Sequence, residues 1–176
     1  MAAAATRYTD PRAHALRERH LATFGGDELP VPVESIAEDL LGLRIEEDDL
    51  GDCSGMLIPA KRLVLVNAVE AMSGETPTRR HRFTIAHEVG HWICHARANE
   101  SAAATYCRSQ DLAQDADRAL EREANVFGAE LLMPETAVHE AWFALADVSE
   151  VANRFGVSAL AAQWRLYSFD LERRPA

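Results

Sequence analysis

The segment FTIAHEVGHWICH, residues 83–95, contains two histidines and a glutamate whose spacing could hold a metal ion. His87 and His91 are four residues apart, so on an α-helix they lie on one face, about 6 Å apart along the axis, and both imidazoles can reach one ion. Glu88 is rotated by about 100° from His87 and lies beside the ion, where it can hold a water molecule. This HExxH pattern predicts a metal site in which Glu88 can hold the metal's water.

A surface helix with scattered His and Glu residues is the plain alternative to a metal site. The neighbours of the motif are mostly apolar, which favours a buried helix: Phe83, Ile85, Ala86, Val89, Trp92 and Ile93. Burying imidazoles and a carboxylate is costly unless they have polar partners. Gly90 lies inside this helix, where it costs up to ~1 kcal/mol relative to Ala. We therefore expect a substrate or a neighbouring helix to pack closely against Gly90.

A catalytic zinc site needs three protein ligands and an open position for water. His95 follows the motif, but on a continuous helix it lies about 12 Å along the axis from His87, too far for two bonds of about 2.1 Å to one ion. We interpret His95 as a histidine near the C-terminal end of the helix, where the helix dipole favours it. The third ligand has to come from another element.

The segment LEREANVFGAELLMP, residues 120–134, offers the best candidate for that third ligand. Glu121, Asn125 and Gly128 recur at i, i+4 and i+7, so they share one helix face, on which small residues let another helix come close. Glu121 can then reach the metal, and Asn125 can hydrogen-bond one of the ligands. Glu123 points about 160° away from Glu121 and is expected to face solvent. The alternative is that Glu121 belongs to a solvated charged run at the start of the helix.

The predicted elements place the candidate ligands on two helices that follow a small β-sheet. A first helix, residues 11–24, begins after Asp10 and ends at the Gly25-Gly26 pair. Periodicity and turn residues predict the remaining elements: a short helix at 30–42, a strand at 43–46, a hairpin of 54–58 and 62–67, helices at 78–97 and 112–132, and two or three short C-terminal helices. The Ala- and Ser-rich residues 98–110 are expected to form a loop near the site.

The chain of 176 residues has about the length of one domain. It contains no internal repeat and no long linker, so we predict a single α+β domain over residues 1–176. Within it, residues 30–134 are expected to form the catalytic core and residues 135–170 a C-terminal helical subdomain.

Residues 148–169 have the sequence pattern of a helix-turn-helix, with Gly156 at the turn. Arg165 is the only basic residue of the second helix, and the chain has a formal net charge of −10. Because contacts to phosphates need clustered Lys and Arg, we expect no direct nucleic-acid partner. A packed helical subdomain that supports the site or docks a protein substrate is the better interpretation.

The cysteines and the hydropathy pattern favour the cytoplasm. Cys53, Cys94 and Cys107 are widely spaced and odd in number, without a CxxC pair, so we expect reduced thiols and no disulfide framework. The N-terminus lacks the apolar run of a signal peptide. No window approaches the roughly 18 apolar residues of a membrane helix.

Four segments together resemble the ImmA/IrrE family of zinc-dependent metallopeptidases: PVPVESIAEDL (30–40), SGMLI and LVLVN (54–67), RFTIAHEVGHWICH (82–95) and EREANVFGAELLMP (121–134). The similarity covers about residues 30–166. HExxH alone is moderately specific, whereas HExxH with the last segment at this distance is strongly so. The resemblance implies a zincin-like fold with a small β-sheet or hairpin and an active-site helix that carries HExxH.

The same resemblance implies a gluzincin-like site, with His87, His91 and Glu121 as zinc ligands and Glu88 as the catalytic base. It implies an intracellular endopeptidase that cleaves an XRE-type helix-turn-helix repressor and so relieves repression in stress responses or mobile elements. Zn²⁺ is the implied metal, and the sequence does not distinguish it from Mn²⁺. Gly128 departs from the family, which usually has Ala at this position.

Three further features are candidates for secondary roles. Tyr106, between the two ligand helices, could donate to the oxyanion, although an ordinary tyrosine fits this position equally well. Strand 62–67 could be an edge to which a substrate adds as an extra strand, and an ordinary sheet strand is the alternative. Cys94 and Cys107 could ligate zinc in a resting state, but plain thiols are the preferred interpretation.

Two other functions compete with the peptidase. A regulator of the same fold could bind a repressor or antitoxin without cutting it, although the intact Glu88 argues against this. A DNA-binding protein with an incidental HExxH is disfavoured because the chain has no basic patch.

Overall fold

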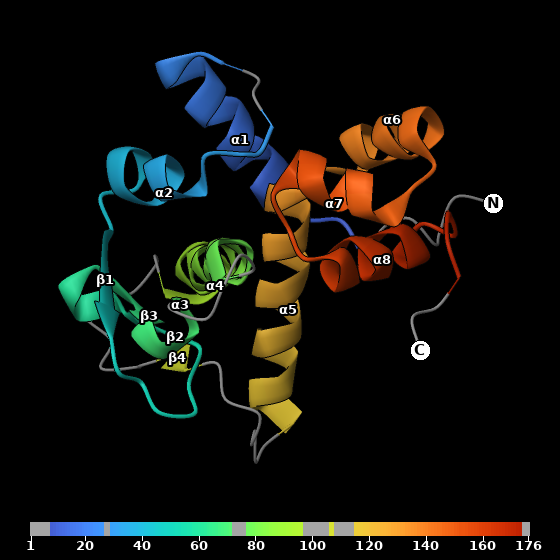
Figure 1. Cartoon of the computed structure of the whole chain (residues 1–176). Helices are drawn as coiled ribbons and strands as arrows, with labels where there is room; N and C mark the ends of the chain where they lie inside the picture. The colour runs from blue at the N-terminus through green and yellow to red at the C-terminus, as the bar shows by residue number, and fades with distance from the viewer. Residues whose placement is uncertain (1–7, 27–28, 72–76, 97–105, 108–114, 174–176) are drawn as a thin grey trace.

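The computed structural model describes residues 8–26, 29–71, 77–96, 106–107 and 115–173. In this part of the chain, two long helices lie side by side, a small sheet covers one of them, and shorter helices cover the other (Figure 1). The expected mixed α+β architecture is confirmed. The division into a core at 30–134 and a subdomain at 135–170 stays a prediction.

The sheet has four strands in the order β1-β3-β2-β4. Its strands are β1 (Arg44–Asp48), β2 (Gly55–Ile58), β3 (Leu63–Asn67) and the short β4 (Tyr106–Cys107). β1 runs parallel to β3, whereas β2 pairs antiparallel with both β3 and β4. A 3-10 turn, Pro59–Lys61, joins β2 to β3 as the predicted hairpin.

β3 lies in the interior of the sheet, so of the two interpretations of residues 62–67 the ordinary sheet strand is confirmed and the free edge is wrong. β1 pairs with one side of β3 and β2 with the other. The physical reason is visible in the composition of the strand, since LVLVN is apolar on both faces, as is typical of a central strand. Its side chains are accordingly almost all buried.

Helix α1 (Pro11–Phe24) has the predicted bounds, and local chemistry explains both ends. The Asp10 carboxylate accepts a hydrogen bond from the backbone N–H of Arg12 at 2.9 Å, and proline occupies the first turn. Gly25 ends the helix at φ 75°, a conformation that disfavours other residues. The next helical segment is shorter than the predicted 30–42: α2 (Val33–Ser35) continues only through a π-helical turn, Ile36–Leu40.

The HExxH motif lies on helix α4 (Pro77–His91), which follows the short α3 (Ala68–Ala71) and continues as a π-helical turn, Trp92–Ala96. Helix α5 (Asp115–Leu132) packs along α4. A Cβ added to Gly90 of α4 would lie 3.0 Å from the carbonyl oxygen of Ala124, and one added to Gly128 of α5 would lie 3.2 Å from the backbone of Ala86. The two glycines therefore allow backbone-to-backbone contact, and α5 is the neighbouring helix that Gly90 led us to expect.

Three helices complete the fold: α6 (Glu135–Leu145), α7 (Val148–Phe155) and α8 (Ala159–Ser168). α7 and α8 meet at Gly156, which has a φ of 63°. Their role as a helix-turn-helix stays a prediction. Arg165 of α8 is only 4% exposed and donates to the carbonyl oxygens of Met133 and Tyr8, so this basic residue is used inside the fold.

The described cysteines differ in their oxidation state. Cys53 is disulfide-bonded, so the expectation of reduced thiols is wrong for this residue, because sequence spacing does not show which cysteines the fold brings together. Cys94 is a free thiol, and the side chain of Cys107 lies outside the described part of the chain. None of the described helices is long and apolar enough to cross a bilayer.

Candidate metal centre

The imidazoles of His87 and His91 point into the same buried space beside α4. Both side chains are 0–1% exposed, and their Nε2 atoms lie 3.1 Å apart. Their rings meet edge to face, with centroids 4.7 Å apart. The i, i+4 spacing thus brings the two nitrogens together as the sequence predicts.

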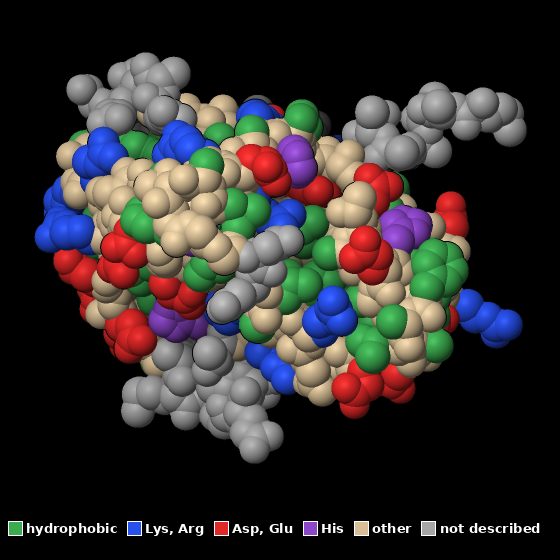
Figure 2. Space-filling view, turned by 90° about the horizontal axis from the view of Figure 1, so that it is seen from above, with side chains coloured by type: hydrophobic (Ala, Val, Ile, Leu, Met, Phe, Trp, Pro, Cys, Tyr) green, Lys and Arg blue, Asp and Glu red, His purple; other side chains and the backbone are tan. Residues whose placement is uncertain are grey.

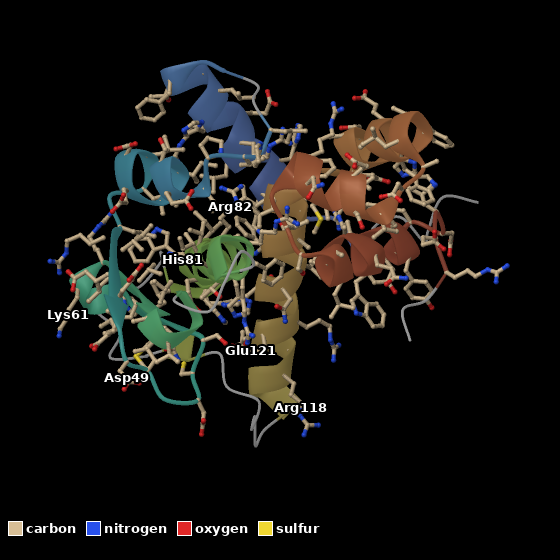
Figure 3. All side chains as sticks on the ribbon, in the orientation of Figure 1. Asp49, Lys61, His81, Arg82, Arg118 and Glu121 are labelled. Atoms are coloured by element: carbon tan, nitrogen blue, oxygen red, sulfur yellow. The ribbon has the colours of Figure 1, made fainter. Side chains whose placement is uncertain are left out.

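Glu121 of α5 completes the group from the other helix, on the side of α5 that faces α4 (Figure 3). Its Oε2 lies 3.1 Å from Nε2 of His87, and its Oε1 lies 2.9 Å from Nε2 of His91. The ligand atoms of all three residues lie within 4.8 Å of one another. Two imidazole nitrogens and one carboxylate oxygen form the donor set that a catalytic zinc ion takes from a protein.

The environment keeps Glu121 ionised. Burial alone would raise the pKa of its carboxyl, but when no metal is bound, protonated Nε2 atoms of His87 and His91 donate to it, and these hydrogen bonds and charges outweigh burial and lower the pKa to about 2. Glu121 can therefore serve as an anionic ligand at neutral pH.

Asn125 orients His87. Its Oδ1 lies 3.1 Å from Nδ1 of His87, and because an amide oxygen only accepts, Nδ1 carries the proton and donates. The lone pair of His87 is then on Nε2, which faces the group of ligand atoms. Asn125 lies where the helix periodicity places it.

His95 lies in the last turn of the π-helical segment Trp92–Ala96, as expected, and it also orients His91 in the same way. Its Nδ1 lies 3.1 Å from Nδ1 of His91, and its Nε2 lies 3.0 Å from Oε2 of Glu123. Since a carboxylate only accepts, His95 donates from Nε2 to Glu123 and accepts on Nδ1 from His91. This leaves the lone pair of His91 on Nε2, beside Glu121.

Glu123 is half-exposed, as expected for a residue that faces solvent, but its carboxylate is also paired. Besides His95, it binds the guanidinium of Arg12 at 2.6 Å, and Arg12 binds Asp10 at 2.7 Å. These bonds, first that of His95 and then that of Arg12, lower the pKa of Glu123. A chain of hydrogen bonds thus runs from the candidate ligand His91 to the start of α1.

A second group of possible ligand atoms, from Cys94, His95 and Glu123, also lies within 4.8 Å. The carboxylate of Glu123 is already paired with the guanidinium of Arg12. Burial raises the pKa of the Cys94 thiol to about 12, so the sulfur stays protonated and binds metal poorly. We therefore assign this group to the support of His91.

Glu88 is fully buried beside strand β2. A Cβ added to Gly55, the first residue of β2, would lie 3.0 Å from Oε1 of Glu88 and 2.3 Å from Cγ2 of Thr84. Gly55 is thus required for the strand to pass over the candidate base. Sequence reasoning missed it, although a glycine at the start of a β-rich run was a signal.

Tyr106 lies on β4, where its backbone pairs with Leu57. Its side chain is outside the described part of the structure, so its role as an oxyanion donor stays a prediction.

A model of a known family, described as the IrrE N-terminal-like domain of Peptidase M78, matches residues 59–167. This range is more than half of the chain and includes α4 and α5. The chain belongs to the Peptidase M78 family. The resemblance to ImmA/IrrE proteins seen in the sequence is thereby confirmed, and membership of a metallopeptidase family implies a metal ion.

A solved structure shows the same fold. A "Mycobacterium tuberculosis transcriptional regulator" superposes on 93% of the M78 chain with a TM-score of 0.61, at 20% sequence identity. The M78 chain spans about half of that regulator, 48% of its length. A comparison with proteins of curated function found no significant match.

Proposed function

We propose that this M78 chain is a zinc-dependent metallo-endopeptidase that hydrolyses a peptide bond in a protein substrate. The observation that carries the proposal is the convergence of His87, His91 and Glu121 from two helices, with their ligand atoms within 4.8 Å. The tautomers that Asn125 and His95 impose also fit a metal, because both leave the Nε2 lone pairs facing the centre of the group.

Each residue has a separate task in the proposed mechanism. Zn²⁺ bound by His87, His91 and Glu121 would supply Lewis-acid chemistry, polarising the scissile carbonyl and activating water. The Glu88 carboxylate accepts a proton from the attacking water as the new C–O bond forms. Glu88 then delivers that proton to the leaving amine as the C–N bond breaks. Tyr106 is proposed as the donor to the oxyanion.

We propose an XRE-type helix-turn-helix repressor as the substrate, cleaved in the cytoplasm during a stress response or the induction of a mobile element. Family membership and the likeness to a protein named as a transcriptional regulator support a regulatory setting. A regulator that binds the repressor without cutting it is the second candidate. The burial of a carboxylate on Glu88, the residue that follows His87 in the chain, favours catalysis over that alternative.

Metal content and cleavage test the proposal with two variants. We expect the wild-type protein to hold about one equivalent of zinc by elemental analysis. The same analysis measures manganese. His91→Ala should lose most of the metal. Glu88→Gln should keep it and fail to cleave a purified repressor encoded beside the chain, as followed by mass spectrometry.

The outcomes separate the candidates. Equal cleavage by wild type and Glu88→Gln, or a wild-type protein that binds neither zinc nor manganese, would refute the peptidase. Stable binding of the repressor without cleavage by the metal-loaded wild type would establish the regulator instead.

A further inference from the structure

A large groove lies between α4, α5 and α8, outside the group of ligand atoms. Its volume is about 870 Å³, within the range of roughly 300–1,000 Å³ that is usual for binding sites. Asn125 lines this groove and also contacts Nδ1 of His87. A molecule in the groove would therefore lie one side chain away from the candidate metal ligands.

The α8 wall of the groove presents an exposed apolar stripe. Leu160, Trp164 and Tyr167 recur at i, i+4 and i+7 on α8, all three line the groove, and they are 58%, 43% and 37% exposed. Phe83 of α4 and Val126 of α5 line the opposite side. Folding leaves this stripe in contact with water, and Trp and Tyr are the residue types that most often dominate the energy of protein interfaces.

The charged residues of the groove are all of one sign. Arg79 and Arg80 from α4, Arg122 from α5 and Arg165 from α8 line it, and none of the described lining residues is acidic. Arg165 is neutralised by the buried Glu130. Arg79 instead donates to the amide oxygen of Asn153 at 2.6 Å and to the carbonyl of Val157 at 3.2 Å, so these contacts leave its charge uncompensated.

This distribution is unusual for a chain with 28 acidic and 18 basic residues. On the face of the molecule shown in Figure 2, acidic and basic side chains are interspersed. Among its described lining residues, the groove combines arginines with an apolar stripe, which complements a segment with apolar side chains on one face and carboxylates on the other.

The walls also indicate how such a segment binds. They are helices, and the described lining includes no strand, so the occupant cannot extend the sheet through backbone hydrogen bonds. Recognition by side chains alone is the mode of an amphipathic helix laid in a groove. We propose that this groove docks an acidic amphipathic helix of the protein substrate and holds the substrate beside the metal centre. That the docked helix belongs to a substrate rests on the proposed function, whereas the binding of such a helix does not.

Fluorescence anisotropy with a synthetic peptide tests the docking directly. The probe is a labelled peptide of about 18 residues, long enough to form a helix, with Leu and Trp at i, i+3, i+4 and i+7 and Glu on the other face. A matched peptide carries Lys in place of Glu. The protein is the full chain with Glu88→Gln, so that cleavage does not interfere.

We expect the acidic peptide to bind and the Lys peptide to bind at least about tenfold more weakly. Arg122→Glu and Trp164→Ala should each weaken the acidic peptide by about tenfold, and added salt should weaken it further. Arg154→Glu and Phe143→Ala are the matched controls, because both residues are exposed and lie outside the groove lining. Neither control should change the affinity.

Three results would overturn the docking proposal. The first is that the acidic and the Lys peptide bind with equal affinity, or that the acidic peptide binds all four variants with equal affinity. The second is tight, Arg122-dependent binding of a short DNA duplex in place of the peptide. The third is a dimer in sedimentation that Trp164→Ala converts to monomer, since a second copy would then fill the groove.

The docking proposal and the proposed function fail separately. If the chain cleaves a repressor, Arg122→Glu should raise KM for it by about tenfold and leave kcat unchanged, and an unchanged KM would overturn the docking. If the acidic peptide binds as expected while Glu88→Gln cleaves as well as wild type, the docking stands and the peptidase mechanism is wrong.

Discussion

At the scale of single residues, the candidate centre depends on side chains that would not touch the metal. Each histidine has two ring nitrogens, and the partner of one decides what the other can do. Asn125 accepts from Nδ1 of His87, and His95 accepts from Nδ1 of His91. Glu123 in turn accepts from His95. These partners therefore keep a proton on each Nδ1, so that Nε2 is the nitrogen left for a metal.

Replacing His95 tests this orientation. His95→Phe keeps an aromatic ring but removes the acceptor for His91, so we expect zinc affinity to fall by about 10- to 100-fold, as is usual when a partner of a metal ligand is lost. The measurement is competition with a chromogenic chelator. His14→Phe, at an exposed position on α1, is the control and should not change the affinity. An unchanged affinity for His95→Phe would contradict the proposed orientation.

How far the sequence predicts the site depends on whether a contact is local. His87, His91 and Asn125 could be placed because helix periodicity alone fixes which residues share a face. The pairing of His95 with Glu123 could not, because it depends on how α5 crosses the end of α4. The role of Arg12 is still more remote, since Arg12 precedes Glu123 by 111 residues in the sequence.

At the scale of elements, the site depends on how closely α4 and α5 approach. The two helices touch backbone to backbone where Gly90 faces Ala124 and Gly128 faces Ala86. The sequence gives a reason to expect a close neighbour at Gly90, but not the order of the sheet strands. Strand pairing is a long-range property, and for that reason the sequence leaves open whether β3 is an edge strand or a central one.

Alanine at the two glycines should have different effects. At Gly90 the new Cβ would lie 3.0 Å from a backbone oxygen and 3.1 Å from a backbone carbon, so overpacking of about 1–3 kcal/mol should outweigh the helix propensity of Ala, ~1 kcal/mol. At Gly128 the contacts are 3.2 Å or longer, and the two effects should nearly cancel. Urea unfolding measures both.

Glu140→Ala, at an exposed position within α6, is the control for helix propensity. A Gly90→Ala protein that is as stable as Gly128→Ala, at equal metal content, would show that α4 and α5 can separate without penalty. It would also contradict the role given to Gly90 in holding Glu121 against the two histidines.

The start of α1 should make stability depend on pH. Burial alone would raise the pKa of Asp10, but hydrogen bonds from the Arg12 side chain and backbone outweigh burial and lower the pKa below its usual value. A carboxyl with a lowered folded pKa stabilises the fold above its unfolded pKa, and this stabilisation is lost as pH falls through the folded pKa.

Asp10→Asn should keep the helix cap, because Asn is a good N-cap residue, while removing the charge. We expect the variant to unfold more easily than wild type at pH 6–7, and the difference in Tm to shrink as pH falls below about 4. Thermal unfolding followed by circular dichroism at a series of pH values measures this. A difference that does not change with pH would assign the loss to the cap alone.

At the scale of the whole molecule, one buried ion pair joins segments from both ends of the chain. Arg165 of α8 bonds Glu130 of α5, and it also donates to the carbonyl oxygens of Met133 and Tyr8. Both charged side chains are at most 8% exposed. Burial lowers the pKa of Arg165 and raises that of Glu130, which marks the desolvation that their attraction has to offset. The position of α8, and with it the groove beside the metal centre, depends on this pair.

Removing one partner should therefore be worse than removing both. Glu130→Ala leaves the guanidinium of Arg165 buried without a countercharge and should lower the free energy of unfolding by about 3–5 kcal/mol. The double variant Glu130→Met, Arg165→Leu removes both charges and should recover most of that loss, although the carbonyls of Met133 and Tyr8 lose their donor. Urea unfolding of the two variants beside wild type measures the difference. If the double variant is the less stable of the two, the hydrogen bonds of Arg165 to the backbone, and not its charge balance with Glu130, hold α8 in place.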